Sequence, residues 1–185
     1  AAGTLTALLP LAGMAGEPID RTLELSPDGK VVVENLAGSI EFSTWDRPEV
    51  QIRGEAGDDV EEVETSATSG GVVVRVRNRK GQRHVDETEL YLKIPQGASI
   101  EAESVSADIS VDDSRGESVV LETVYGDLEF ESESKRVELT SVSGEIEFEG
   151  RAVRTVAEIV SGDVSLVGAS GEVSASTVSG DLFME

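Results

Sequence analysis

Residues 160–181 read VSGDVSLVGASGEVSASTVSGD, so the tetrapeptide Val-Ser-Gly-Asp both opens and closes this stretch. Three near-copies precede it in the chain: VSAD from Val105, VYGD from Val124 and VSGE from Val142. The first valines of the five copies occupy positions 105, 124, 142, 160 and 178, so the interval between copies is nearly constant. A fixed period this short is typical of a solenoid, in which each repeat forms one coil.

Apolar residues recur at four further positions around each valine, namely the fifth and third before it and the fourth and sixth after it. These positions hold Ile100, Ala102, Ile109 and Val111; Val119, Leu121, Leu128 and Phe130; Val137, Leu139, Ile146 and Phe148; Thr155, Ala157, Val164 and Leu166; and Val173, Ala175, Leu182 and Met184. The alternation of apolar with other residues predicts strands, because successive side chains on a strand point to opposite faces. Between the third position before the valine and the valine itself this alternation shifts by one residue, which predicts a corner at which the valine faces inward. We therefore expect an all-β fold: a right-handed parallel β-helix, or β-solenoid, with about 18 residues per coil.

The same template fits one earlier stretch, VVVENLAGSIEF at residues 31–42, which we interpret as the first coil. Between it and the regular array lie three alternating segments, EVQIRG, GGVVVRVRN and ELYLKIP. We expect them to form irregular coils or an antiparallel meander that covers one end of the solenoid. The segment DDVEEVE, residues 58–64, is the one candidate helix.

The second residue after the valine is small in every copy. It is Ala107 in one copy and glycine in the other four. Because alanine would be strained at a positive φ, we interpret this position as an inward-facing site at a tight corner, where only a small side chain fits.

The next residue is acidic in every copy, and we expect its side chain to point outward. These residues are Asp108, Asp127, Glu145, Asp163 and Asp181. A column of carboxylates offers oxygen ligands of the kind that Ca²⁺ prefers, but one carboxylate per coil falls short of the six to eight oxygens that Ca²⁺ takes. We therefore expect ordinary turn chemistry, with no metal and no cofactor, and keep Ca²⁺ binding by these five residues as the alternative.

Composition restricts the partners and the chemistry. Acidic residues outnumber basic ones 37 to 15, and the net charge of -22 predicts no binding to nucleic acid or to anionic membrane. The same acidity is also typical of proteins from high salt, where charge repulsion is screened. The chain has no cysteine and one histidine, His84, which lies in the basic segment RNRKGQRH. We interpret that segment as a solvated hairpin tip, and Trp45 as a packing anchor at the solenoid end.

Residues 1–16, AAGTLTALLPLAGMAG, are apolar and uncharged, and we interpret them as a signal-peptide remnant; a short buried helix or strand is the alternative. The stretch is too short to span a bilayer, and we expect no membrane insertion in the mature chain. Residues 17–98 then form an N-terminal β region, and residues 99–185 form the regular coils. Beyond Glu185 we expect further coils or a cap, or else self-association through the open strand edge.

Three features together carry a family resemblance: the export-like N-terminus, the segment IDRTLELSPDGKVVVENLAGSIEFSTWDRPEVQIRG, and LYLKIPQGASIEAESVSADISV with the coils that follow it. The chain resembles, from about residue 17 to its end, the bacterial "putative adhesin" family, a β-helix domain of unknown function. The resemblance implies an exported, non-enzymatic adhesin-like module of the periplasm or cell surface that meets a surface protein or polysaccharide. The alternatives are a Ca²⁺-dependent scaffold and, third, a polysaccharide-active enzyme.

Overall fold

The computed structural model describes residues 17–68, 70–81 and 85–185. Within these residues the fold is all-β, with no helix, and its strands join one continuous sheet. The strands are β1 (Glu17–Glu24), β2 (Lys30–Trp45), β3 (Glu49–Ala56), β4 (Val60–Thr68), β5 (Gly71–Asn78), β6 (Thr88–Pro95), β7 (Ser99–Ser114), β8 (Ser118–Tyr125), β9 (Leu128–Ser132), β10 (Arg136–Ser143), β11 (Ile146–Gly150), β12 (Arg154–Ser161), β13 (Val164–Val167), β14 (Glu172–Ser179) and β15 (Leu182–Met184).

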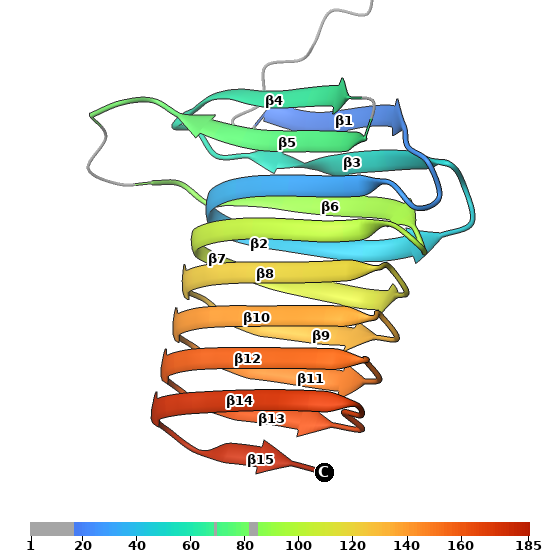
Figure 1. The fold of residues 1–185 in the computed structure, drawn as a ribbon. Coiled ribbons are helices and arrows are strands. Elements are labelled where there is room, and N and C mark those ends of the chain that lie inside the picture. Colours follow the sequence, from blue (N-terminus) through green and yellow to red (C-terminus); the bar gives the residue numbers. More distant parts are fainter. Residues whose placement is uncertain (1–16, 69, 82–84) are drawn as a thin grey trace, which may run out of the picture.

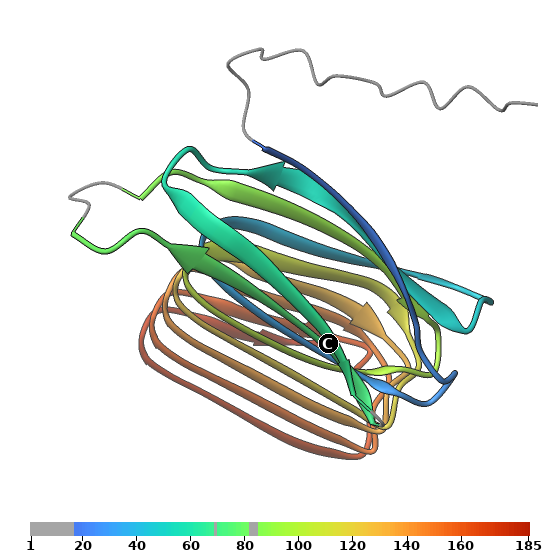
Figure 2. The same ribbon diagram turned by 90° about the horizontal axis from the view of Figure 1, so that it is seen from above.

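The sheet folds back on itself into two facing walls, and the chain winds around the space between them (Figures 1 and 2). One wall contains β4, β5, the first half of β2, the first half of β7, and then β8, β10, β12 and β14. The other wall contains β1, β3, β6, the second halves of β2 and β7, and then β9, β11, β13 and β15. From β7 onward each coil places one strand in each wall, and neighbouring strands are parallel.

The predicted inward sites of the two walls stack in register. In one wall Ile100, Val119, Val137, Thr155 and Val173 pair in order along the stack. In the other wall Val111, Phe130, Phe148, Leu166 and Met184 do the same. This register confirms the parallel, solenoid-like stacking that the repeat predicts.

The space between the walls is a dry apolar core. Phe130 and Phe148 are about 1% exposed and stack with ring centroids 5.7 Å apart. Burying such a side chain contributes roughly 1.5–3 kcal/mol relative to leaving it in water. Thr155 is the polar member of its column: it is fully buried, and its hydroxyl has no hydrogen-bond partner within the described part of the chain.

The first coil lies where the template places it, because β2 pairs in parallel with β7 from Lys30 opposite Ser99 to Phe42 opposite Val111. The segment between them adds two kinds of pairing at the N-terminal end. Strands β5 and β6 run parallel to the two halves of β2, whereas β3 is antiparallel to β6 and β1, and β4 is antiparallel to β5. Both expected arrangements, irregular coil and antiparallel meander, therefore occur together.

The prediction of a helix at residues 58–64 is wrong, because residues 60–64 belong to strand β4. Opposite β5, Glu64 pairs with Arg75 and Val63 with Val76, after a register shift between Val60 and Glu62. The irregularity explains why Val60 and Val63, whose spacing of three looks helical in the sequence, both pack against the core from one strand.

Candidate functional site

The Val-Ser-Gly-Asp corner forms a band of outward side chains along one long edge of the solenoid. The valines do not face the core as expected, because the exposed fractions of Val105, Val142, Val160 and Val178 are 45%, 42%, 50% and 83%. Instead the residue before each valine faces inward; Thr123, Ser141 and Ile159 are at most 4% exposed. The change of parity therefore falls two residues later than predicted, between the residue before the valine and the small residue after it.

Hydroxyl groups make this inward position compatible with burial. Thr123 Oγ1 donates to the carbonyl oxygen of Ala107 at 3.3 Å, and Thr177 Oγ1 donates to that of Gly162 at 3.1 Å. Each bond reaches back to a carbonyl oxygen at the corner of the preceding coil, so these hydroxyl groups have a hydrogen-bond partner where they face inward. In the sequence these polar residues look exposed, and Ile159 is the one member whose type signals burial.

The glycines are required for two reasons. Gly144, Gly162 and Gly180 have φ of 145°, 142° and 144°, so the interpretation that rejected a positive φ is wrong for these coils. A Cβ on Gly162 would lie 1.7 Å from the carbonyl oxygen of Gly144, which agrees with the predicted close packing. Ala107 fits because it lies within the uninterrupted strand β7 and does not have a positive φ.

The predicted acidic column is exposed at all five positions, Asp108, Asp127, Glu145, Asp163 and Asp181. Its aspartates form a hydrogen-bonded ladder, in which a carboxylate oxygen accepts the backbone N–H of the acidic residue in the next coil. Asp108 Oδ1 accepts from Asp127 N at 2.9 Å, Asp127 Oδ1 from Glu145 N at 2.8 Å, and Asp163 Oδ1 from Asp181 N at 2.7 Å.

The ladder is interrupted where the acidic residue is a glutamate. In the described chain, the backbone N–H of Asp163 has no acceptor, although Glu145 precedes it in the column. The extra methylene of glutamate carries its carboxylate beyond the N–H that an aspartate reaches. The carboxylates thus have a local role in closing the corner, and the described residues contain no cluster of three or more acidic or histidine side chains suited to a metal ion.

The sequence also singles out Trp45 and His84, and the structure describes only the first of them. Trp45 is half-buried, its Nε1 donates to the Glu49 carbonyl oxygen at 2.8 Å, and the Arg47 guanidinium lies 5.1 Å from its ring centroid. These contacts are those of a packing anchor. His84 and residues 82–83 lie outside the described residues.

Arg77, in the basic segment, and Arg75, two residues before it, both form local ion pairs. Arg77 Nε lies 2.7 Å from Glu64 Oε1, and Arg75 Nε lies 2.8 Å from Glu34 Oε1. The hydrogen bond from Arg77 lowers the pKa of Glu64, and the same bond raises the pKa of Arg77. The cluster therefore offsets neighbouring acid, as expected from the sequence.

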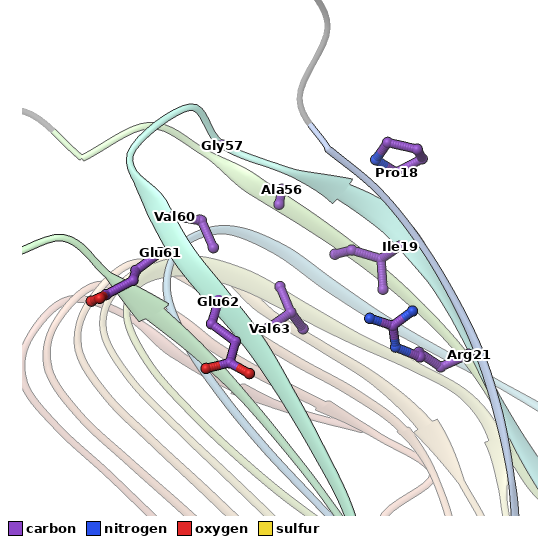
Figure 3. Close-up of a pocket in the computed structure, with 9 residues that line it drawn as sticks. All are labelled: Pro18, Ile19, Arg21, Ala56, Gly57, Val60, Glu61, Glu62 and Val63. Atoms are coloured by element: carbon purple, nitrogen blue, oxygen red, sulfur yellow. The ribbon is translucent and has the colours of Figure 1, made fainter. Parts of the chain in front are cut away.

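A slot of about 360 Å³, lined by apolar and charged side chains, opens at the N-terminal end of the core, between β1 and β4 (Figure 3). Ile19 and Val63 point toward each other across it, and Val60 and Ala56 lie beside them. The slot lies at the N-terminal end of the space between the walls, and Arg21, Glu61 and Glu62 also line it. No helix in the described chain could cross a bilayer.

Comparison with known proteins places the chain by fold. The family model described as Toastrack DUF4097 matches residues 39–185. A solved structure of a "putative adhesin" from Bacteroides fragilis aligns with a TM-score of 0.60 at 12% identity, covering 91% of this chain and 97% of that one. A "putative cell adhesion protein" from Clostridium sporogenes aligns with a TM-score of 0.55 at 11% identity, covering 91% and 99%. No curated protein matches the sequence.

Proposed function

Because the chain belongs to the Toastrack DUF4097 family, we propose that it is a non-enzymatic, adhesin-like binding module, exported to the periplasm or the cell surface. Two of its structural relatives have adhesin or cell adhesion descriptions. The export-like residues 1–16 support the location, although they lie outside the described residues. The proposal includes a right-handed winding with about 18 residues per coil, as the repeat predicts.

The observation that carries this proposal is the exposed corner band. Large apolar side chains in water are unfavourable, and contiguous exposed apolar surface is typical of interaction sites. Here Val105, Val142, Val160 and Val178 repeat along one edge, with Tyr125 exposed beside them. Stacked coils place Val142, Val160 and Val178 one strand spacing, about 4.8 Å, apart, and Val105 lies two spacings from Val142, on the far side of the coil that carries Tyr125.

The polar columns of the band support contact rather than catalysis. Beside the valines run a mostly hydroxyl column, containing Ser143 and Ser161, and the carboxylate ladder. The ladder carboxylates are exposed and bonded to backbone N–H groups, so they lack the desolvated setting that tunes a carboxyl group for acid–base catalysis. A surface protein or polysaccharide that offers apolar patches and hydrogen-bond donors fits this band.

A binding assay with envelope preparations of the producing organism tests the proposal. The double variant Val142→Ser, Val160→Ser removes exposed apolar surface from the band without touching the core. Val153→Ser is a matched control, because Val153 is 68% exposed in a turn away from the band. We expect the wild type and the control to bind alike and the double variant to lose most of its binding while its circular dichroism spectrum stays unchanged. Equal binding by all three proteins, or no binding by the wild type, would contradict the proposal.

Self-association through the C-terminal strand edge remains a separate proposal. Leu182, Phe183 and Met184 of β15 are all more than two-fifths exposed. Comparing the sedimentation of the wild-type protein with that of the Phe183→Lys variant tests this proposal, because a charge on an edge strand opposes edge-to-edge pairing. Concentration-dependent dimers in the wild type alone would support this contact.

A further inference from the structure

A hollow of about 260 Å³, lined by charged and hydroxyl side chains and by the Tyr91 ring, lies on the outer surface of the second wall, where β3, β6, β2 and β7 run side by side (Figure 1). It is built mainly from strands of the N-terminal region, and β7 is the strand that it shares with the corner band. Its lining includes Arg53, Tyr91, Lys93, Glu41, Ser43 and Asp112. The small side chain of Ser43 lies between longer ones, which accounts for the depression.

The registers of the four strands arrange these side chains in two rows. In one row Arg53 pairs with Tyr91, and Tyr91 pairs with Glu41. In the other row Lys93 pairs with Ser43, while Asp112 directly follows the pair of Phe42 with Val111. Each row therefore has a cation at one end and a carboxylate at the other, two strand spacings or about 9.6 Å apart.

These charges are not neutralised by each other. Lys93, Glu41 and Asp112 form no ion pair with any residue that the structure describes. Arg53 has one contact, to Asp20 at 3.9 Å, between side chains that are 60% and 70% exposed. Exposed pairs of this length contribute little, so the guanidinium is available to a ligand.

Tyr91 lies between the two charged ends. Its ring is 42% exposed, and its hydroxyl donates to Glu89 Oε2 at 3.1 Å. That bond, with the negative charges of Glu89 and Glu41 nearby, raises the pKa of Tyr91, so the phenol stays neutral. A neutral aromatic ring beside carboxylates is the chemistry that binds ammonium and quaternary ammonium groups.

We propose that this hollow binds a phosphate–ammonium zwitterion of the phosphocholine or phosphoethanolamine class. Arg53 and Lys93 would hold the phosphate, since guanidinium and ammonium groups are the usual protein partners of phosphate. Tyr91, Glu41 and Asp112 would hold the cationic end. The cation and the carboxylate of each row lie on strands only two spacings apart, so a compact zwitterion, whose opposite charges are joined by a short linker, can reach both ends.

The charge of the whole chain favours such a ligand over an anionic one. A net charge of -22 repels an acidic polysaccharide, whereas a ligand without net charge is not repelled. A simple cation would leave Arg53 and Lys93 unpartnered. The inference goes beyond the proposed adhesin-like function and does not depend on the corner band.

Titration of phosphocholine into the isotope-labelled protein, followed by amide chemical shifts, tests the proposal. We expect shifts at Ser43, Tyr91 and Lys93, with choline chloride and inorganic phosphate each binding at least about tenfold more weakly, because each supplies one end only. Phosphatidylcholine vesicles form a second arm: binding to both vesicles and free phosphocholine assigns a lipid headgroup, and binding to free phosphocholine alone assigns a soluble or polymer-linked zwitterion.

Two variants with the same loss of charge make the test specific. Lys93→Gln should weaken phosphocholine binding by about tenfold, the effect of losing one charge-assisted contact. Lys80→Gln, at an exposed lysine outside the hollow, should change it by less than about twofold. Equal effects of the two variants, equal binding of choline or phosphate alone, or no shifts at about 20 mM phosphocholine would overturn the proposal. None of these results bears on envelope binding by the corner band, so the two proposals fail separately.

Discussion

Replacing Glu145 with aspartate should stabilise the protein by completing the carboxylate ladder. The N–H of Asp163 lacks an acceptor in the described chain, whereas the N–H groups of Asp127, Glu145 and Asp181 each have one at 2.7–2.9 Å. A net intramolecular hydrogen bond contributes about 0.5–1.5 kcal/mol, and the exposure of this corner puts the gain in the lower half of that range. The substitution leaves the net charge unchanged, so overall charge repulsion is the same.

The measurement combines thermal unfolding with amide hydrogen exchange. A gain of about 0.5–1 kcal/mol corresponds to a rise of about 1–4 °C in the melting temperature of a chain this size. Exchange at the Asp163 amide should slow specifically, because that is the group that gains a partner. The local readout matters because a solenoid can open coil by coil, and a single melting temperature then averages over coils.

The reciprocal variant Asp127→Glu is the matched control. It lengthens the side chain that now accepts from Glu145 N at 2.8 Å, so it should lower the stability by the same amount and speed exchange at the Glu145 amide. If Glu145→Asp leaves Asp163 exchange unchanged, or if both substitutions shift the melting temperature in the same direction, the ladder is not the stabilising contact that its geometry indicates.

Three further outcomes follow from the core, the corner and the acidic column. Thr155→Val should raise the free energy of unfolding by roughly 0.5–1.5 kcal/mol in urea titrations, because it removes a buried hydroxyl that has no partner in the described chain; a loss would show that the hydroxyl is bonded. Gly162→Ala should lower it by more than about 2 kcal/mol, because of strain at φ 142° and the contact with Gly144, whereas Gly70→Ala, with open space around the new Cβ, should stay within about 0.5 kcal/mol. Exchanging Ca²⁺ for a chelator at constant ionic strength should move the melting temperature by less than about 2 °C, and a larger shift would favour the Ca²⁺-dependent scaffold.

The walls of the solenoid could be predicted from the sequence, and the corner could not. In the walls an inward site such as Phe130 or Phe148 is flanked by charged residues, so residue type alone reveals the face. At the corner, hydroxyl side chains bond to carbonyls inside the fold, and valines lie outside it. Thr123 and Val142 therefore have the opposite of the exposure that their types indicate, and the residue that faces inward at the corner is the one before the valine, not the valine itself.

The hollow could not be predicted from the sequence, for a different reason. Arg53, Tyr91, Glu41 and Asp112 come from four different strands, and only the registers of β3, β6, β2 and β7 bring them together. Each residue alone is an ordinary outward side chain of a strand. The acidic column, in contrast, was visible because the repeat places its members at equal intervals, although its hydrogen-bonded ladder was not.

The pairing of β2 with β7 has a consequence for how the chain acquires its structure during synthesis. Phe42 and its partner Val111 are separated by the whole N-terminal excursion, whereas Val137 pairs with Thr155 in the very next coil. The longer loop is roughly four times the length of a regular coil, and closing it costs only about 1 kcal/mol more in chain entropy, so the excursion is cheap at equilibrium. The long loop instead affects the timing of folding, because the edge of β2 that pairs with β7 has no partner until Val111 has left the ribosome. Each later strand can then pair with the strand of the coil before it, which is already formed.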